Sequence, residues 1–92
     1  MPKAPRRQIR REPTQFPRRA AALGIGERQL DMALEDVEEL ISVNAEYFPV
    51  VEGTSLRVAK TRPAYGVPGL RLFFTIDSDD QCTLWAVDAL PG

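Results

Sequence analysis

The chain has 92 residues, of which 43% are hydrophobic and 27% charged, and its formal net charge at pH 7 is -1. A chain of this length fills one hydrophobic core, so we expect a single domain over residues 1–92. It contains no histidine, one cysteine (Cys82), and no apolar stretch of the roughly 18 residues that span a bilayer. A transmembrane helix, an intrachain disulfide and any histidine-dependent catalytic or metal site are therefore excluded. We expect a cytoplasmic protein with no membrane partner, no metal and no cofactor.

The near-neutral net charge hides a strong segregation of charge along the chain. Residues 1–28 carry eight basic and two acidic groups, residues 29–52 seven acids and no base, and residues 53–72 four bases and no acid. This pattern excludes a whole-protein field that attracts nucleic acid, but it permits a local basic face. The alternative is that the blocks neutralise one another in the folded domain.

The first half of the chain predicts one strand and two helices. We expect residues 1–5 to be disordered and residues 6–12, "RRQIRRE", to form an edge strand before Pro13. The segment 14–26, "TQFPRRAAALGIG", predicts a short helix capped at Gly24, and two helix ends explain its glycines better than a phosphate-binding loop does. The segment 26–44 predicts a longer amphipathic helix with one apolar stripe: Leu30, Ala33, Leu34, Val37, Leu40 and Ile41.

The second half predicts three strands. Residues 54–60 read as a strand, residues 61–69 as a loop rich in proline and glycine, and residues 69–90 as a hairpin with an acidic polar turn. Helices followed by a run of strands are typical of an α+β domain. We therefore predict the order β-α-α-β-β-β, with an N-terminal edge strand and a two-helix hairpin packed on one face of a small antiparallel sheet.

Alternation along the strands predicts which side chains share a face of the sheet. In the hairpin predicted over residues 69–90, the first arm is the strand before the turn and the second arm is the strand after it. With a three-residue turn at 78–80, Cys82, Leu84 and Ala86 of the second arm join the apolar face of the first arm. A four-residue turn would exchange the two faces of the second arm. The apolar face of the first arm consists of Leu70, Leu72, Phe74 and Ile76. The open face would then consist of Ser55, Arg57, Ala59, Arg71, Phe73, Thr75, Thr83, Trp85 and Val87, with Leu56 and Val58 inside.

The predicted open face places Arg57 and Arg71 beside Phe73 and Trp85. Arginines next to exposed aromatic rings are typical of surfaces that bind phosphates and stack bases. The alternative is structural, since Arg71 could extend its side chain to pair with an acid such as Asp88 or one on the long helix. The residues alone leave both interpretations open.

The chain resembles the RelE/ParE superfamily of type II toxin–antitoxin toxins over roughly residues 8 to 89. The likeness lies in the order of elements, in "FPRRAAALGIGERQLDMALEDVE" for the paired helices, and in "GTSLRVAK", "VPGLRLFFTID" and "CTLWAVD" for the sheet. The resemblance implies a bacterial toxin whose partner is a cognate antitoxin protein. It also implies one of two targets, mRNA on the ribosome or DNA gyrase.

RelE-type members are metal-independent endoribonucleases that cleave mRNA with basic residues on the open sheet face. By this resemblance Arg71, Arg57 and Lys60 would be catalytic, and Arg62, Phe73 and Trp85 would contact RNA. The attack of a ribose 2′-hydroxyl on its neighbouring phosphate gathers negative charge, which fixed cations stabilise.

The last predicted strand departs from the ribonuclease pattern. It reads "TLWAVDALPG", and no Arg, Lys, His or Tyr follows Arg71. A ParE-like toxin that inhibits DNA gyrase by protein contact needs no such residues, and neither does a diverged, non-catalytic interaction domain. The sequence therefore leaves three functions open: a toxin-like ribonuclease, a protein-binding toxin and an interaction domain.

Overall fold

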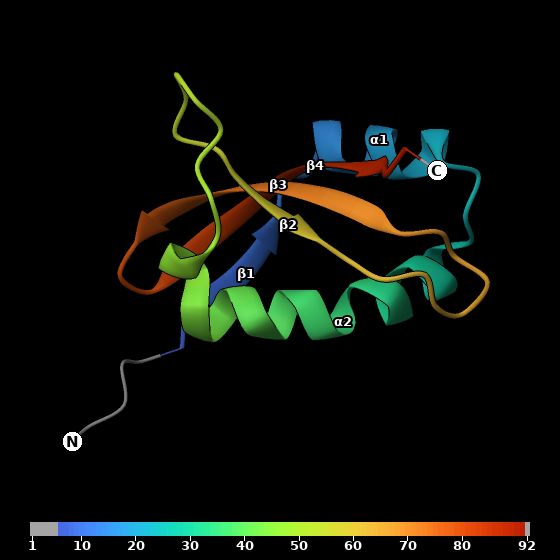
Figure 1. Ribbon diagram of the computed structural model, residues 1–92, viewed down its shortest axis with the longest axis horizontal. Helices are drawn as coiled ribbons and strands as arrows, with labels where there is room; N and C mark the ends of the chain where they lie inside the picture. Colours follow the sequence, from blue (N-terminus) through green and yellow to red (C-terminus); the bar gives the residue numbers. More distant parts are fainter. Residues whose placement is uncertain (1–5, 92) are drawn as a thin grey trace.

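The computed structural model describes residues 6–91 and contains the predicted α+β order. Strand β1 (Gln8–Arg11) is followed by helices α1 (Gln15–Ala22) and α2 (Glu27–Asn44) and by a short 3-10 helix, η1 (Ala45–Tyr47). Strands β2 (Arg57–Lys60), β3 (Leu70–Ser78) and β4 (Gln81–Ala89) complete the chain (Figure 1). The residues 1–5 expected to be disordered lie outside the described part. None of the helices within residues 6–91 is long and apolar enough to cross a membrane.

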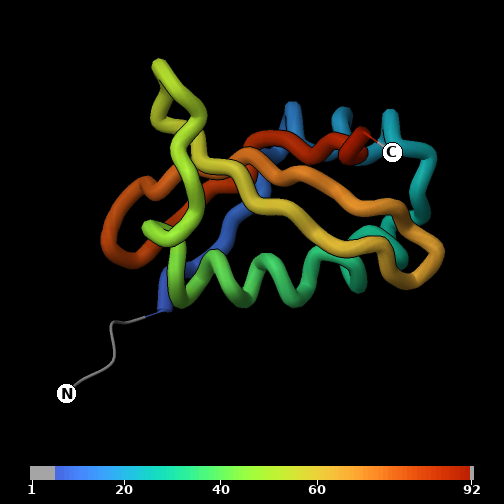
Figure 2. The backbone as a smooth tube through the Cα atoms, viewed as in Figure 1, coloured from blue at the N-terminus to red at the C-terminus, as the bar shows by residue number. Residues whose placement is uncertain are grey.

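The four strands form one sheet in the order β1-β4-β3-β2. Strands β2, β3 and β4 are antiparallel as predicted, whereas β1 pairs in parallel with the first half of β4, so the sheet is mixed. Figure 2 shows the three C-terminal strands side by side, with the chain before β2 standing out from the body of the domain. Strand β1 lies at one edge of the sheet and β2 at the other.

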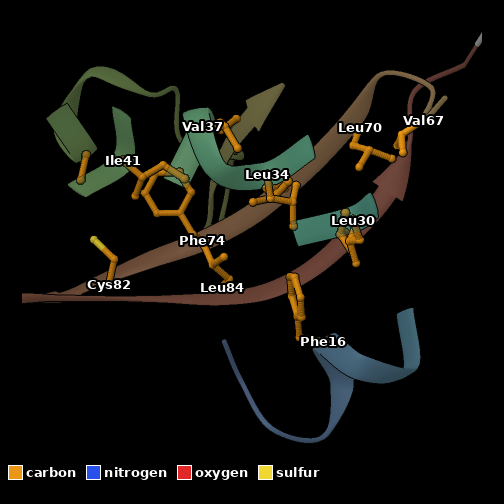
Figure 3. Close-up of a cluster of buried hydrophobic side chains, with 14 residues drawn as sticks. Phe16, Leu30, Leu34, Val37, Ile41, Val67, Leu70, Phe74, Cys82 and Leu84 are labelled. Carbon is orange, nitrogen blue, oxygen red and sulfur yellow. The ribbon is translucent and has the colours of Figure 1, made fainter. Parts of the chain in front are cut away.

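Helix α2 packs its apolar stripe on one face of the sheet, which we call the inner face. Leu30, Leu34, Val37 and Ile41 are at most 5% exposed and lie four and three residues apart, as one side of a helix requires. Figure 3 shows these side chains packed among those of β3 and β4. The strand side chains in this core are Ala59, Leu70, Leu72, Phe74, Cys82, Leu84 and Val87. The predicted inner set of β3 and the buried position of Cys82 are confirmed.

Helix α1 packs against β4. Thr14, the residue before the helix, makes no side-chain cap, and the carboxylate of Glu12 instead accepts the backbone N–H groups of Thr14 (2.7 Å) and Gln15 (2.5 Å). The helix ends at Ala22, and Gly24 two residues later has a φ of +69°, a conformation that glycine adopts without strain. The prediction that these glycines mark a helix end is confirmed.

The basic N-terminal block is neutralised by the acidic block of α2 and η1. Arg11 of β1 contacts Asp31 at 2.6 Å and Glu38 at 2.8 Å, and its guanidinium also stacks on the Phe16 ring. Arg6 pairs with Glu39 and Arg7 pairs with Glu46. These ion pairs therefore connect β1 and the residues before it to α2 and η1.

The register of the β3–β4 hairpin differs from the prediction beyond Trp85. The turn contains two residues, Asp79 and Asp80, because Ser78 faces Gln81. A bulge on β3 after Ile76 restores the predicted pairing around Cys82 and Leu84, and these two residues face inward as expected. A second bulge on β4 then places both Trp85 and Ala86 opposite Phe73.

The β4 bulge inverts the faces of the residues that follow it. Val87 pairs with Leu72 and is fully buried, whereas Ala86 lies on the opposite face with Phe73. The prediction that Ala86 faces the core and Val87 faces away was therefore wrong. A bulge adds one residue to one strand, and alternation alone cannot reveal that residue.

Strand β2 also has the opposite parity to the prediction. Arg57 pairs with Phe74 and Ala59 pairs with Leu72, so both lie on the inner face, and Ala59 is 1% exposed. Val58 pairs with Phe73 on the other face, and Leu56 lines a hollow there. The predicted inward positions of Leu56 and Val58 were wrong, as were the outward positions of Arg57 and Ala59. Pairing with β3 sets this register, and nothing local to residues 54–60 fixes it.

One predicted member of the helix stripe is not buried. Leu40 is 51% exposed, because the line of contact runs through Val37 and Ile41 and leaves Leu40 on its flank. The expectation that Leu40 packs in the core was wrong, since a helical repeat of 3.6 residues places position 40 about 100° from position 41.

Candidate functional site

The face of the sheet opposite α2, called the outer face, holds most of the predicted site residues. Strand pairing places Lys60 across from Arg71, and Phe73 beside Trp85 and Ala86. Gln15 and Arg19 of α1 border a shallow hollow in this face, which measures about 330 Å³. The other residues lining the hollow are Leu56, Phe73, Trp85, Ala86 and Asp88.

Arg71 lies near the start of β3 on the outer face, and only part of its hydrogen-bonding capacity is used. It pairs with Asp88 on the neighbouring strand at 3.9 Å, the limit of an ion pair, and its guanidinium lies 5.3 Å from the centre of the Phe73 ring. Its Nε is buried and has no hydrogen-bond acceptor, although the side chain as a whole is 38% exposed. A buried donor without an acceptor costs about 1–3 kcal/mol, so this N–H group lowers the stability that the Arg71 side chain contributes.

Asp88 is shared between two arginines. Its carboxylate lies 3.5 Å from Arg19 of α1 as well as 3.9 Å from Arg71. The ion pair between Arg71 and Asp88 is the contact expected if Arg71 has the structural role that the sequence left open. Sequence reasoning did not find Arg19, because its approach to β4 depends on where α1 packs and no local pattern indicates that position.

Arg57 is not part of the outer face. Its guanidinium donates to the backbone carbonyl oxygens of Glu46 (3.2 Å) and Phe48 (2.7 Å), on the α2 side of the sheet. The predicted clustering of Arg57 with Arg71 was therefore wrong. Arg57 instead fixes the chain that leaves η1, because it supplies donors to carbonyl groups that no strand or helix satisfies.

The two other basic residues of this block lie at the edge of the sheet. Lys60 is exposed at the end of β2, across from Arg71. Arg62 follows the strand, and both Lys60 and Arg62 line a groove against α2. Among residues 6–91 neither side chain makes an ion pair, in contrast to Arg6, Arg7 and Arg11. Only Lys60 of the two can approach a ligand on the outer face.

The predicted aromatic pair is present and is held by a polar network. Trp85 is half-buried, and its Nε1 donates to Thr75 Oγ1 at 2.9 Å. The Thr75 hydroxyl in turn donates to Asp77 at 2.7 Å, and the Thr83 hydroxyl also donates to Asp77. These bonds fix the indole on the outer face, where the bulge places it next to Phe73. The resulting surface combines two aromatic rings with one arginine.

The outer face combines a guanidinium group and two aromatic rings with the carboxylate of Asp88. Guanidinium groups and aromatic rings can contact phosphates, carboxylates or planar side chains. Cleavage of a phosphodiester needs fixed cations around the developing charge. Here Asp88 places a negative charge beside Arg71, and β4 contributes no basic or tyrosine side chain.

Comparison with known proteins found no similar protein: no family model, no curated protein and no solved structure matches this chain.

Proposed function

We propose that this chain is a toxin of the RelE/ParE kind that acts by binding a protein, as gyrase-inhibiting members do. The resemblance of "LRLFFTID" and of the helix pair supports the class, and the confirmed β-α-α-β-β-β order agrees with it. DNA gyrase is the proposed target, and a small antitoxin encoded beside this gene is the proposed partner. Such a toxin would act in the cytoplasm.

One observation favours binding over catalysis. The pairing of β2 with β3 turns Arg57 toward the helix side, so that the charged residues across from Arg71 are Asp88 on β4 and Lys60 on β2, and no second arginine joins them. A carboxylate at this point would repel a phosphate and oppose the negative charge of a cleavage transition state. The same mixed charge suits a protein surface, where both signs find partners.

The test is inducible expression in a bacterium, with and without the neighbouring open reading frame. We expect growth arrest that the neighbouring protein relieves, and inhibition of gyrase supercoiling by the purified chain. Primer extension on ribosome-bound messages should show no new 5′ ends. Absence of growth arrest would contradict the toxin assignment and leave a non-catalytic interaction domain.

Ribosome-dependent mRNA cleavage is the second candidate, because Lys60, Arg71, Phe73 and Trp85 share one face. Asp88→Asn separates the two functions, since it removes the charge that opposes a phosphate without removing volume. A ribonuclease should cleave faster with this variant and lose cleavage with Arg71→Ala. Arg71→Lys should restore only part of the cleavage, because lysine lacks the planar fork. A protein-binding toxin should show no cleavage with any of the three variants.

A further inference from the structure

An apolar groove separate from the outer face runs between α2 and the loop that follows β2. Its volume is about 290 Å³, and residues 60–65 form one wall while α2 forms the other. In Figures 1 and 2 the turn between β2 and β3 lies beside the first part of α2. The side chain of Gln29 on α2 holds the turn there by donating to the carbonyl oxygen of Tyr65 at 3.3 Å.

The groove exposes large apolar side chains. Met32 is 40% exposed, Leu40 is 51% exposed and Tyr65 is 56% exposed, and all three line the groove. Val37 and Phe48 line it as well and lead into the core. Exposed apolar residues that gather in one concave place, instead of being scattered, mark an interaction site.

The backbone at Tyr65 is held in a conformation that disfavours its side chain. Tyr65 has a φ of +57° and Gly66 a φ of +73°, and Ala64 pairs with Val67 across this tight turn. Glycine, asparagine or aspartate would fit position 65 better than a tyrosine. A bulky residue in such a conformation is maintained where its side chain has a use, and here that side chain lines the groove.

The two walls of the groove carry opposite charges that have no partner. Lys60 and Arg62 lie on the loop wall and Asp36 lies on the α2 wall, and none of them makes an ion pair within residues 6–91. A partner that fits the groove therefore needs acidic groups toward the loop and a basic group toward α2.

We propose that this groove binds an amphipathic helix of a partner protein, with an apolar stripe flanked by acids on one side and a base on the other. An added strand fits less well, because residues 49–51 already pair along β2, with Val58 N–H donating to the carbonyl oxygen of Pro49 at 3.0 Å. A second copy of the chain fits less well too. Its α2 already buries its apolar stripe on its own sheet, and its α1 offers two bases and no acid for the loop wall.

The test is selection from a displayed library of helices about 18 residues long, which is about five turns. Each helix carries a fixed leucine stripe, and both flanks vary among Asp, Lys and Ala. We expect the folded chain to enrich helices with Asp on one flank and Lys on the other. Selection against Arg62→Glu should replace those aspartates with lysine, whereas selection against Arg18→Glu, a charge-matched change on α1, should give the wild-type pattern.

The affinity of one enriched helix peptide then tests the apolar wall. Leu40→Asp should weaken binding by about tenfold or more, as loss of a central apolar contact does, while Val43→Asp, one turn further along α2, should leave affinity unchanged. Tyr65→Asn relieves the backbone strain, so it should weaken binding without lowering the melting temperature.

Two outcomes would overturn the proposal. One is selection of helices with no preference for Asp or Lys on either flank, and the other is a Leu40→Asp variant that binds the peptide as tightly as the wild type does. A dimer of the chain alone that Leu40→Asp dissociates would overturn it too, because the occupant would then be a second copy. Growth arrest is not used as a readout, so this test is independent of the toxin assignment.

Discussion

At the scale of single residues, the four cations of residues 53–72 have three different kinds of surroundings. Arg57 bonds backbone carbonyl groups, Arg71 stacks on Phe73 beside Asp88, and Lys60 and Arg62 lie unpaired at the edge of β2. Because their chemistry is similar, their different roles follow from where the strands place them. Arg57 is the one of the four that is bonded most completely.

Arg57→Ala should therefore destabilise the fold. The change removes the donor to the exposed Glu46 carbonyl oxygen and to the part-buried Phe48 carbonyl oxygen, and a lost hydrogen bond costs about 0.5–1.5 kcal/mol. The denaturation midpoint in urea should fall while the slope of the transition stays unchanged. Arg62→Ala is the matched control and should change the free energy of unfolding by less than about 0.5 kcal/mol. Equal effects of the two changes would show that Arg57 has no structural role.

At the scale of elements, two bulges define the β3–β4 hairpin. The bulge at Trp85 keeps the indole on the outer face and turns Val87 into the core. Without it, the residues of β4 after Trp85 would face the other way. The outer-face surface and the inner packing therefore depend on the same extra residue.

Substitutions at positions 86 and 87 test this register. Val87→Ser removes a fully buried side chain and buries a hydroxyl, so it should cost about 2 kcal/mol or more. Ala86→Ser, on the outer face, should change the free energy of unfolding by less than about 0.5 kcal/mol. Thermal denaturation of both variants is the measurement. A larger loss of stability with Ala86→Ser than with Val87→Ser would show that these residues alternate as predicted without a bulge.

Helix α1 depends on a carboxylate that lies outside it. Desolvation raises the pKa of Glu12, but hydrogen bonds from the backbone N–H groups of Gln15, Thr14 and Phe16 outweigh this effect and lower the pKa overall. A carboxyl group with a lower pKa in the folded state stabilises the fold above its unfolded pKa, and this contribution is lost as pH falls through the folded pKa.

Glu12→Gln should therefore lower the melting temperature at neutral pH and have a smaller effect in acid. The difference between the wild type and Glu12→Gln should shrink as pH falls from about 6 to about 3, across the usual range for glutamate. Glu52→Gln is the control, because it changes the net charge by the same amount at an exposed position in the loop before β2. A difference that stayed constant with pH would exclude capping by the ionised carboxylate.

At the scale of the whole molecule, one core joins α2 to the inner face. Phe74 is fully buried, and its ring centre lies 5.6 Å from that of Phe48 in an edge-to-face contact. Phe48 also lines the apolar groove, so the core and the groove share a side chain. Packing of Phe74 thus supports both the fold and one wall of the proposed interaction site.

Phe74→Ala should remove much of the stability of a domain this small. A buried Phe→Ala change costs about 3–5 kcal/mol, whereas whole domains are stable by about 5–15 kcal/mol. Phe73→Ala, at the neighbouring half-buried position on the outer face, should cost clearly less. Calorimetry of the two variants gives the comparison. Unchanged melting of Phe74→Ala would mean that the inner and outer faces of β3 are assigned the wrong way round.

The sequence by itself determined the order of elements, the ends of both helices and the inner face of β3. These features follow from local patterns: a repeat of 3.6 residues, alternation along one strand, and a glycine at a helix end. Only the tertiary structure decided that β1 pairs in parallel with β4, that α1 brings Arg19 to Asp88, and that Arg57 faces inward. Alternation shows which residues of one strand share a face, but pairing with a distant strand decides which face that is. One extra residue, such as the bulge at Trp85, reverses the assignment for every residue after it.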